Sequence, residues 1–137
     1  MSYIQHKHDD NCKYGSYIHY LVEAAPSILW FDVQDIGGYQ GSVYGVGLYK
    51  SKILIYEDYY GSCSGCGAWG EGGEPNSESD VLLKSTQFDT VEDTFAYLLN
   101  TKFDGGPNTT QMQKAIKEAD KFRTKREVTR NEKKKAR

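Results

Sequence analysis

The sequence predicts a mixed α+β fold: a three-stranded antiparallel meander with flanking helices and a long basic C-terminal helix. Two periodicities predict it. Apolar and polar residues alternate within residues 27–60, as half-buried strands require, and apolar residues recur every three or four positions within residues 16–25 and 90–122, as amphipathic helices require. A length of 137 residues with 38% hydrophobic content fits one domain around one core.

The strand region contains a bare patch. In its second strand, Gly45 and Gly47 leave one face without side chains, which invites close approach by a ring or another backbone. Ser51 and Lys52 form a connection of hairpin length before the third strand. The predicted strands cover residues 27–36, 42–50 and 53–60.

Helix boundaries are marked by caps and breakers. Ser16 caps a first helix that Pro26 ends, Thr90 caps a second, and Thr109 or Thr110 caps the last. The last helix is expected to dock through a stripe of apolar side chains and to project or fray beyond it, where apolar residues are scarce. That stripe consists of Met112, Ala115, Ile116, Ala119 and Phe122.

Charge is distributed unevenly along the chain. Residues 121–137 hold nine Lys or Arg against two Glu, a net charge of +7, whereas residues 1–120 carry −9. We therefore expect an acidic α+β domain at 1–120 and a basic helical or frayed tail at 121–137. Such a tail attracts phosphates in a salt-dependent way, and the alternative is a solubilising end that folds back on the acidic domain. The candidate nucleic-acid contacts are Arg123, Lys125, Arg126, Arg130, Lys133 and Lys134.

Residues 61–79 form a Gly/Cys loop. The loop shows no periodicity and carries the pair Cys63 and Cys66. A stretch of this kind in a compact domain is usually functional or disordered. Two cysteines at Cys-x-x-Cys spacing can chelate one zinc ion from a tight turn, and Gly65 and Gly67 fit such a turn.

A closed zinc site needs four ligands, so two more would come from the N-terminal arm. Cys12 and His8 are the leading candidates, because their spacing of four places both on one helical face; the other two histidines are alternatives. On this hypothesis the chain holds one structural zinc. The competing hypotheses are a free or reversibly oxidised thiol pair and a thiol redox protein that uses Cys63 and Cys66. No helical pattern follows Cys66, which disfavours redox catalysis.

Acidic residues close the first and third predicted strands. Asp32 and Asp35 end one, and Glu57 and Asp58 end the other, so neighbouring strands could bring two carboxyl groups together as a metal site or an acid–base pair. Glu57 and Asp58 cannot pair with each other, because adjacent strand residues face opposite sides. A solvated acidic face is the alternative.

The stretch Tyr60-Gly61-Ser62-Cys63-Ser64-Gly65-Cys66, with the predicted hairpin before it, resembles small uncharacterised bacteriophage and prokaryotic proteins. The resemblance is a two-strand hairpin that runs into a Tyr-Gly-Ser-Cys-x-x-Cys loop, and it covers less than a third of the chain. It implies an accessory protein of a phage or mobile element that acts by binding, and it brings no catalytic residues.

We therefore expect a non-enzymatic binding protein that engages a host or phage macromolecule. A protein is the first partner expected, and inhibition of a host defence or regulatory system is one concrete version, since an acidic domain can occupy a cationic groove. The alternatives are nucleic-acid binding through the tail and thiol redox chemistry. The expected binding residues, on the strand face and the loop, are Tyr39, Tyr44, Tyr59, Tyr60 and Trp69.

The sequence also predicts a location. No apolar run approaches the roughly 20 residues that cross a bilayer. The N-terminus lacks the apolar stretch of a secretory signal. We expect a cytoplasmic protein, in the host cytoplasm if it is phage-encoded, without a membrane partner.

Overall fold

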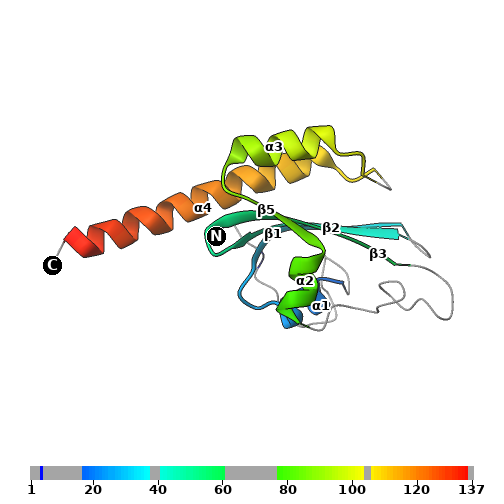
Figure 1. Ribbon diagram of the computed structural model, residues 1–137, viewed down its shortest axis with the longest axis horizontal. Coiled ribbons are helices and arrows are strands. Elements are labelled where there is room, and N and C mark those ends of the chain that lie inside the picture. The colour runs from blue at the N-terminus through cyan, green and yellow to red at the C-terminus, as the bar shows by residue number, and fades with distance from the viewer. Residues whose placement is uncertain (1–3, 5–16, 38–40, 61–76, 104–105, 136–137) are drawn as a thin grey trace.

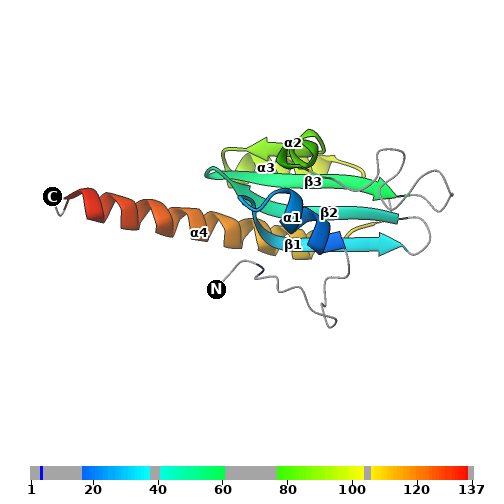
Figure 2. The ribbon, with the colours of Figure 1, turned by 90° about the horizontal axis from the view of Figure 1, so that it is seen from below.

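The computed structural model describes residue 4 and residues 17–37, 41–60, 77–103 and 106–135. Within these ranges an antiparallel sheet lies between two layers of helices (Figures 1 and 2). The predicted α+β class and the C-terminal helix are confirmed. In chain order the elements are α1 (Tyr17–Ala24), β1 (Leu29–Gly37), β2 (Gly41–Tyr49), β3 (Lys52–Tyr60), α2 (Glu78–Leu83), β5 (Ser85–Phe88), α3 (Val91–Asn100) and α4 (Thr109–Lys135).

The sheet has four strands in the order β1-β2-β3-β5, whereas the sequence predicts three. The additional strand, β5, pairs antiparallel with β3, from Ile53 opposite Phe88 to Tyr56 opposite Ser85. Four residues with the sequence Ser-Thr-Gln-Phe are too short to show an alternation, which is why the pattern misses this strand.

Each face of the sheet builds its own apolar core, because alternate strand residues point to opposite sides. On β3, Leu54 and Tyr56 join the core under α1 and α2, while Ile53 and Ile55 join the core under α3 and α4 (Figure 1). The first core also contains Leu21, Ala25, Ile28, Trp30 and Val81, and the second contains Tyr44, Val46, Leu98, Met112, Ala115 and Ile116.

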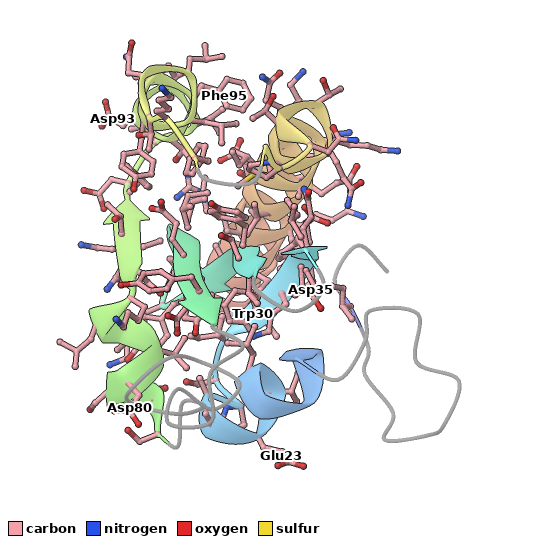
Figure 3. All side chains as sticks on the ribbon, turned by 90° about the vertical axis from the view of Figure 1, so that its right-hand side faces the viewer. Glu23, Trp30, Asp35, Asp80, Asp93 and Phe95 are labelled. Carbon is pink, nitrogen blue, oxygen red and sulfur yellow. The ribbon has the colours of Figure 1, made fainter. Side chains whose placement is uncertain are left out.

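Trp30 lies across the two glycines of β2. A Cβ atom on Gly45 would lie 2.5 Å from Trp30 Cζ3, and one on Gly47 would lie 2.9 Å from Ile28 Cγ2. Trp30, labelled in Figure 3, is 2% exposed. Its indole meets the Tyr56 ring edge-on, with the ring centroids 6.0 Å apart. The bare face predicted at these glycines thus receives an aromatic ring, which larger residues there would exclude.

The turn between β2 and β3 is strained. Its two central residues are Lys50 and Ser51, one position earlier than the predicted connection, and both have positive φ, 48° and 67°. Two such residues form the tight hairpin turn that normally selects glycine or asparagine. The carbonyl oxygen of Ser51 accepts a hydrogen bond of 3.0 Å from Arg123 Nη1, so α4 holds this turn in place.

The start of α4 is tied to the sheet. Its cap is Asn108 rather than Thr109 or Thr110, and Asn108 Oδ1 accepts a hydrogen bond of 3.0 Å from the backbone N–H of Gln111. The side chain of Gln34 on β1 donates to the Asn108 carbonyl at 3.0 Å and accepts from its N–H at 2.8 Å. These bonds fix where the helix begins.

The first half of α4 packs on the sheet, as predicted, and the second half projects from it (Figures 1 and 2). Four residues of the predicted stripe are buried, Met112, Ala115, Ile116 and Ala119. The fifth, Phe122, is half-buried and meets Phe31 of β1 with ring centroids 5.8 Å apart. The helix continues unbroken to Lys135, so the expected boundary at residues 120 and 121 falls inside one element of 27 residues.

Replacing Gly45 by alanine is expected to lower the free energy of unfolding by about 2–3 kcal/mol, because the new methyl group would overlap Trp30 in a packed core. Urea unfolding of the two chains measures the difference. If the overlap is the cause, the cost of Gly45→Ala should fall below about 1 kcal/mol in a Trp30→Leu background. An equal cost in both backgrounds would contradict the contact.

Candidate functional site

The predicted zinc ligands lie outside the described residues. This applies to Cys63 and Cys66 of the Gly/Cys loop and to Cys12 and His8 of the arm. Among the residues that the structure does describe, no group of three His, Cys, Asp or Glu side chains could hold a metal ion. That finding does not bear on the loop, and the zinc site stays a prediction.

The predicted tyrosine surface is divided. Tyr44 is 4% exposed and packs edge-on against Phe103, so it belongs to the core rather than to a binding surface. Tyr44 shares its strand face with Val46 and Leu48, a pattern visible in the sequence. Tyr59 is 68% exposed. Tyr39, Trp69 and the Tyr60 side chain lie outside the description.

The strand register keeps the predicted carboxyl groups apart. Asp35 and Asp58 both stand opposite Val43 of β2, so one strand separates them, at about 10 Å between Cα atoms. Asp32 and Glu57 belong to the other face, where each is engaged separately. Asp32 accepts hydrogen bonds from Gln34 and Gln111, and Glu57 accepts one from Tyr97. The sheet therefore does not form an acid–base pair from these four residues.

Asp58 is a buried acid with a structural role. It is 8% exposed, and its carboxylate accepts hydrogen bonds from the Tyr56 hydroxyl at 2.9 Å and the Tyr59 backbone N–H at 2.8 Å. Burial raises the pKa of Asp58 despite these two bonds and the charge of Lys84, which act in the opposite direction. Burial and the neighbouring carboxylate likewise raise the pKa of Tyr56.

A row of lysines runs along α4 on the side opposite its buried stripe. We call Lys114, Lys117, Lys121 and Lys125 the lysine ridge; all four side chains are exposed. Their spacing of three, four and four residues keeps them on one face of a helix. The ion pairs found in the described part of the chain are Lys52–Asp89 and Arg123–Asp120, so neither involves the ridge.

The candidate cations predicted in the tail are not equivalent. Arg123 is occupied: its side chain is 13% exposed, and it binds Asp120 through Nε and Nη2, both at 2.9 Å, and the Ser51 carbonyl through Nη1. Arg126 is exposed and lies over the Phe122 ring at 5.7 Å. Arg130, Lys133 and Lys134 belong to the described backbone of α4 only.

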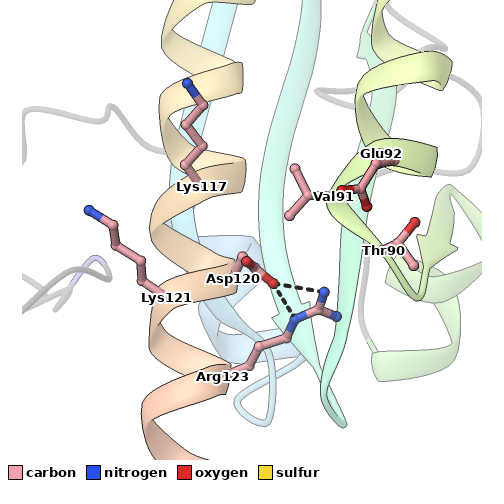
Figure 4. Close-up of a pocket in the computed structure, with 7 residues that line it drawn as sticks. All are labelled: Thr90, Val91, Glu92, Lys117, Asp120, Lys121 and Arg123. Carbon is pink, nitrogen blue, oxygen red and sulfur yellow. Dashed lines mark hydrogen bonds and ion pairs between the residues drawn. The ribbon is translucent and has the colours of Figure 1, made fainter.

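A groove of about 450 Å³ separates the first turn of α3 from α4 (Figure 4). Lys117 and Lys121 project outward from α4, whereas Asp120 and Arg123 are joined on the side toward α3. Glu92 contributes a further carboxylate to the lining. The groove mixes both signs of charge and so offers no uniform field for an ionic ligand. Two members of the lysine ridge, Lys117 and Lys121, form its outer edge.

No family model, no curated protein and no solved structure matches this chain. None of the helices in the described part of the chain is both long enough and apolar enough to cross a bilayer.

We expect the purified protein to contain about one zinc per chain if the four-ligand hypothesis is correct. Elemental analysis should then find the metal lost in Cys63→Ser and retained in the neighbouring control Ser62→Ala. Metal-free wild-type protein after expression in zinc-supplemented medium would reject the site and leave the thiol hypotheses.

Asp58→Asn is expected to stabilise the fold at pH 7 by about 1 kcal/mol. The amide can keep both hydrogen bonds, with its oxygen accepting from Tyr59 and its NH₂ donating to Tyr56, and it removes a buried charge. In the wild type, the folded pKa lies above the ordinary value of 3.8, so the folded state binds the proton more tightly. Stability from this group therefore falls as the pH rises from 3.8 through the raised pKa.

Thermal unfolding between pH 4 and pH 8 measures this effect. The variant should lose that part of the pH dependence, and the exposed control Asp35→Asn should keep it. A variant that is less stable than the wild type at pH 7 would show that the carboxylate is needed in its charged form.

Proposed function

We propose that this chain is a non-enzymatic binding protein that engages nucleic acid through the outward face of α4. The observation that carries the proposal is the lysine ridge, which places four exposed ammonium groups in a row about 17 Å long. A row of cations without ion-pair partners among the described residues suits a polyphosphate backbone, which gains affinity by releasing counterions.

The arrangement of the acidic side chains supports this proposal. Glu23, Asp80 and Asp93 point outward from α1, α2 and α3, on surfaces other than the lysine ridge (Figure 3). A similar division appears along the chain, where residues 1–120 carry −9 and residues 121–137 carry +7. An approaching polyanion is repelled by the sheet domain and attracted by α4, which orients it before contact.

The resemblance to phage proteins fits a small accessory protein that binds a host or phage macromolecule, here nucleic acid, in the cytoplasm. A protein partner on the tyrosine face has less support. Tyr44 is buried, and of the predicted binding residues only Tyr59 has a described, exposed side chain.

Exchanging both Lys117 and Lys121 for glutamine is expected to weaken nucleic-acid binding about tenfold at low salt. The plot of log affinity against log salt should become shallower by about two, one for each lost phosphate contact. Fluorescence anisotropy with a labelled 20-mer over a salt series measures both quantities.

The matched control replaces Lys84 and Lys102, two exposed lysines outside α4, by glutamine. It changes the net charge equally and should change affinity far less. Equal loss in the two double variants would mean that overall charge, rather than the lysine ridge, sets the binding.

A further inference from the structure

The second half of α4 projects from the sheet and from the other helices of the described residues. The contacts between α4 and the sheet that the structure gives extend to Phe122 and Arg123. Nine helical residues follow Arg126, about 14 Å of helix that stands clear of the sheet domain in both ribbon views (Figures 1 and 2). A helix with its side chains is about 10–12 Å across, so this segment can enter a channel of that width from the end.

Residues 126–135 carry five Lys or Arg against two Glu, so positive charge is in excess along this half of the helix. Arg126, Arg130 and Lys134 occupy positions four apart, where like charges destabilise a helix. Val128 is the one apolar residue between 123 and 135, so no stripe is available to pack against a second apolar surface. A dense array of negative charge around the helix would relieve the repulsion.

The three common forms of nucleic acid differ in how they accommodate such a helix. The major groove of B-form DNA is about 12 Å wide and admits an α-helix, whereas the major groove of A-form RNA is too narrow. Single strands are usually held by aromatic side chains on which bases stack. The lysine ridge contains none, and Phe122 is packed against Phe31. The geometry points to B-form duplex DNA as the partner of α4, an inference that rests on the proposed function.

In this complex the projecting half lies in the major groove and the lysine ridge follows the flanking phosphates. The acidic domain stays outside, because the sheet and its helices end where the free part of α4 begins (Figure 2). Lysine is a point charge that contacts phosphates without reading base identity at a fixed geometry. We therefore expect binding with little dependence on DNA sequence.

The test distinguishes binding of an intact helix in the DNA major groove from general electrostatic attraction between a basic segment and a polyanion. Thr129→Pro breaks the projecting helix without changing any charge, and Thr129→Ala is the control that keeps it. Anisotropy with the full chain compares a 20-bp DNA duplex, the same sequence as duplex RNA, and the DNA single strand. Wild type and Thr129→Ala should bind duplex DNA about tenfold more tightly than the other two.

Thr129→Pro should lose this preference while its affinity for single-stranded DNA and the salt at which it elutes from heparin stay unchanged. Its melting temperature should also match the wild type, since the projecting half makes no described contact with the core. Equal wild-type affinity for all three probes would overturn the duplex inference and leave the proposed function standing. A preference that survives in Thr129→Pro would overturn it too, and no binding to any probe would overturn both.

Discussion

The rotation of α4 about its own axis is the constraint on which the candidate interface depends. Met112, Ala115, Ile116 and Ala119 are 0–5% exposed against the sheet, and this burial decides which residues face outward. Each fully buried side chain of this kind contributes on the order of 1–3 kcal/mol, more than any single exposed ion pair. Apolar packing therefore decides which charged residues of α4 face outward.

Polar contacts then fix α4 along its length at two points. The Gln34 side chain holds the first turn through Asn108. Arg123, which is oriented by Asp120 on the same helix, holds the middle of α4 through the carbonyl of Ser51 in the strained turn. Between these points the helix cannot slide or roll without breaking hydrogen bonds to β1 and to the β2–β3 turn. The part of α4 that carries the lysine ridge is therefore held against the sheet by hydrogen bonds. The projecting half of α4 has no such bond among the described residues.

Periodicity predicts those parts of the fold that apolar side chains determine. It identifies the three long strands, the docked stripe of α4 and the bare face at Gly45 and Gly47, because burial imposes a regular pattern there. It misses β5, whose position follows from pairing with β3 rather than from its own sequence. It also misses Lys114 and Lys117, because the nearby Glu118 and Asp120 cancel their charges in any sum along the chain. Helical spacing shows what the sum hides, because it turns Asp120 toward α3 and leaves the four lysines in one row.

The two halves of α4 derive their stability from different sources. The docked half is held by the core. The projecting half has no apolar stripe and an excess of positive charge, and isolated helices of this length are marginal in water. The negative charge of a bound polyanion would stabilise the projecting half of the helix, which tertiary packing does not stabilise. Binding and helix stability should therefore be coupled. Such coupling lowers affinity for a given contact area, since part of the interaction energy orders the helix. The lysine ridge offsets part of that cost, because the helix backbone that carries it is already packed on the sheet before any partner arrives.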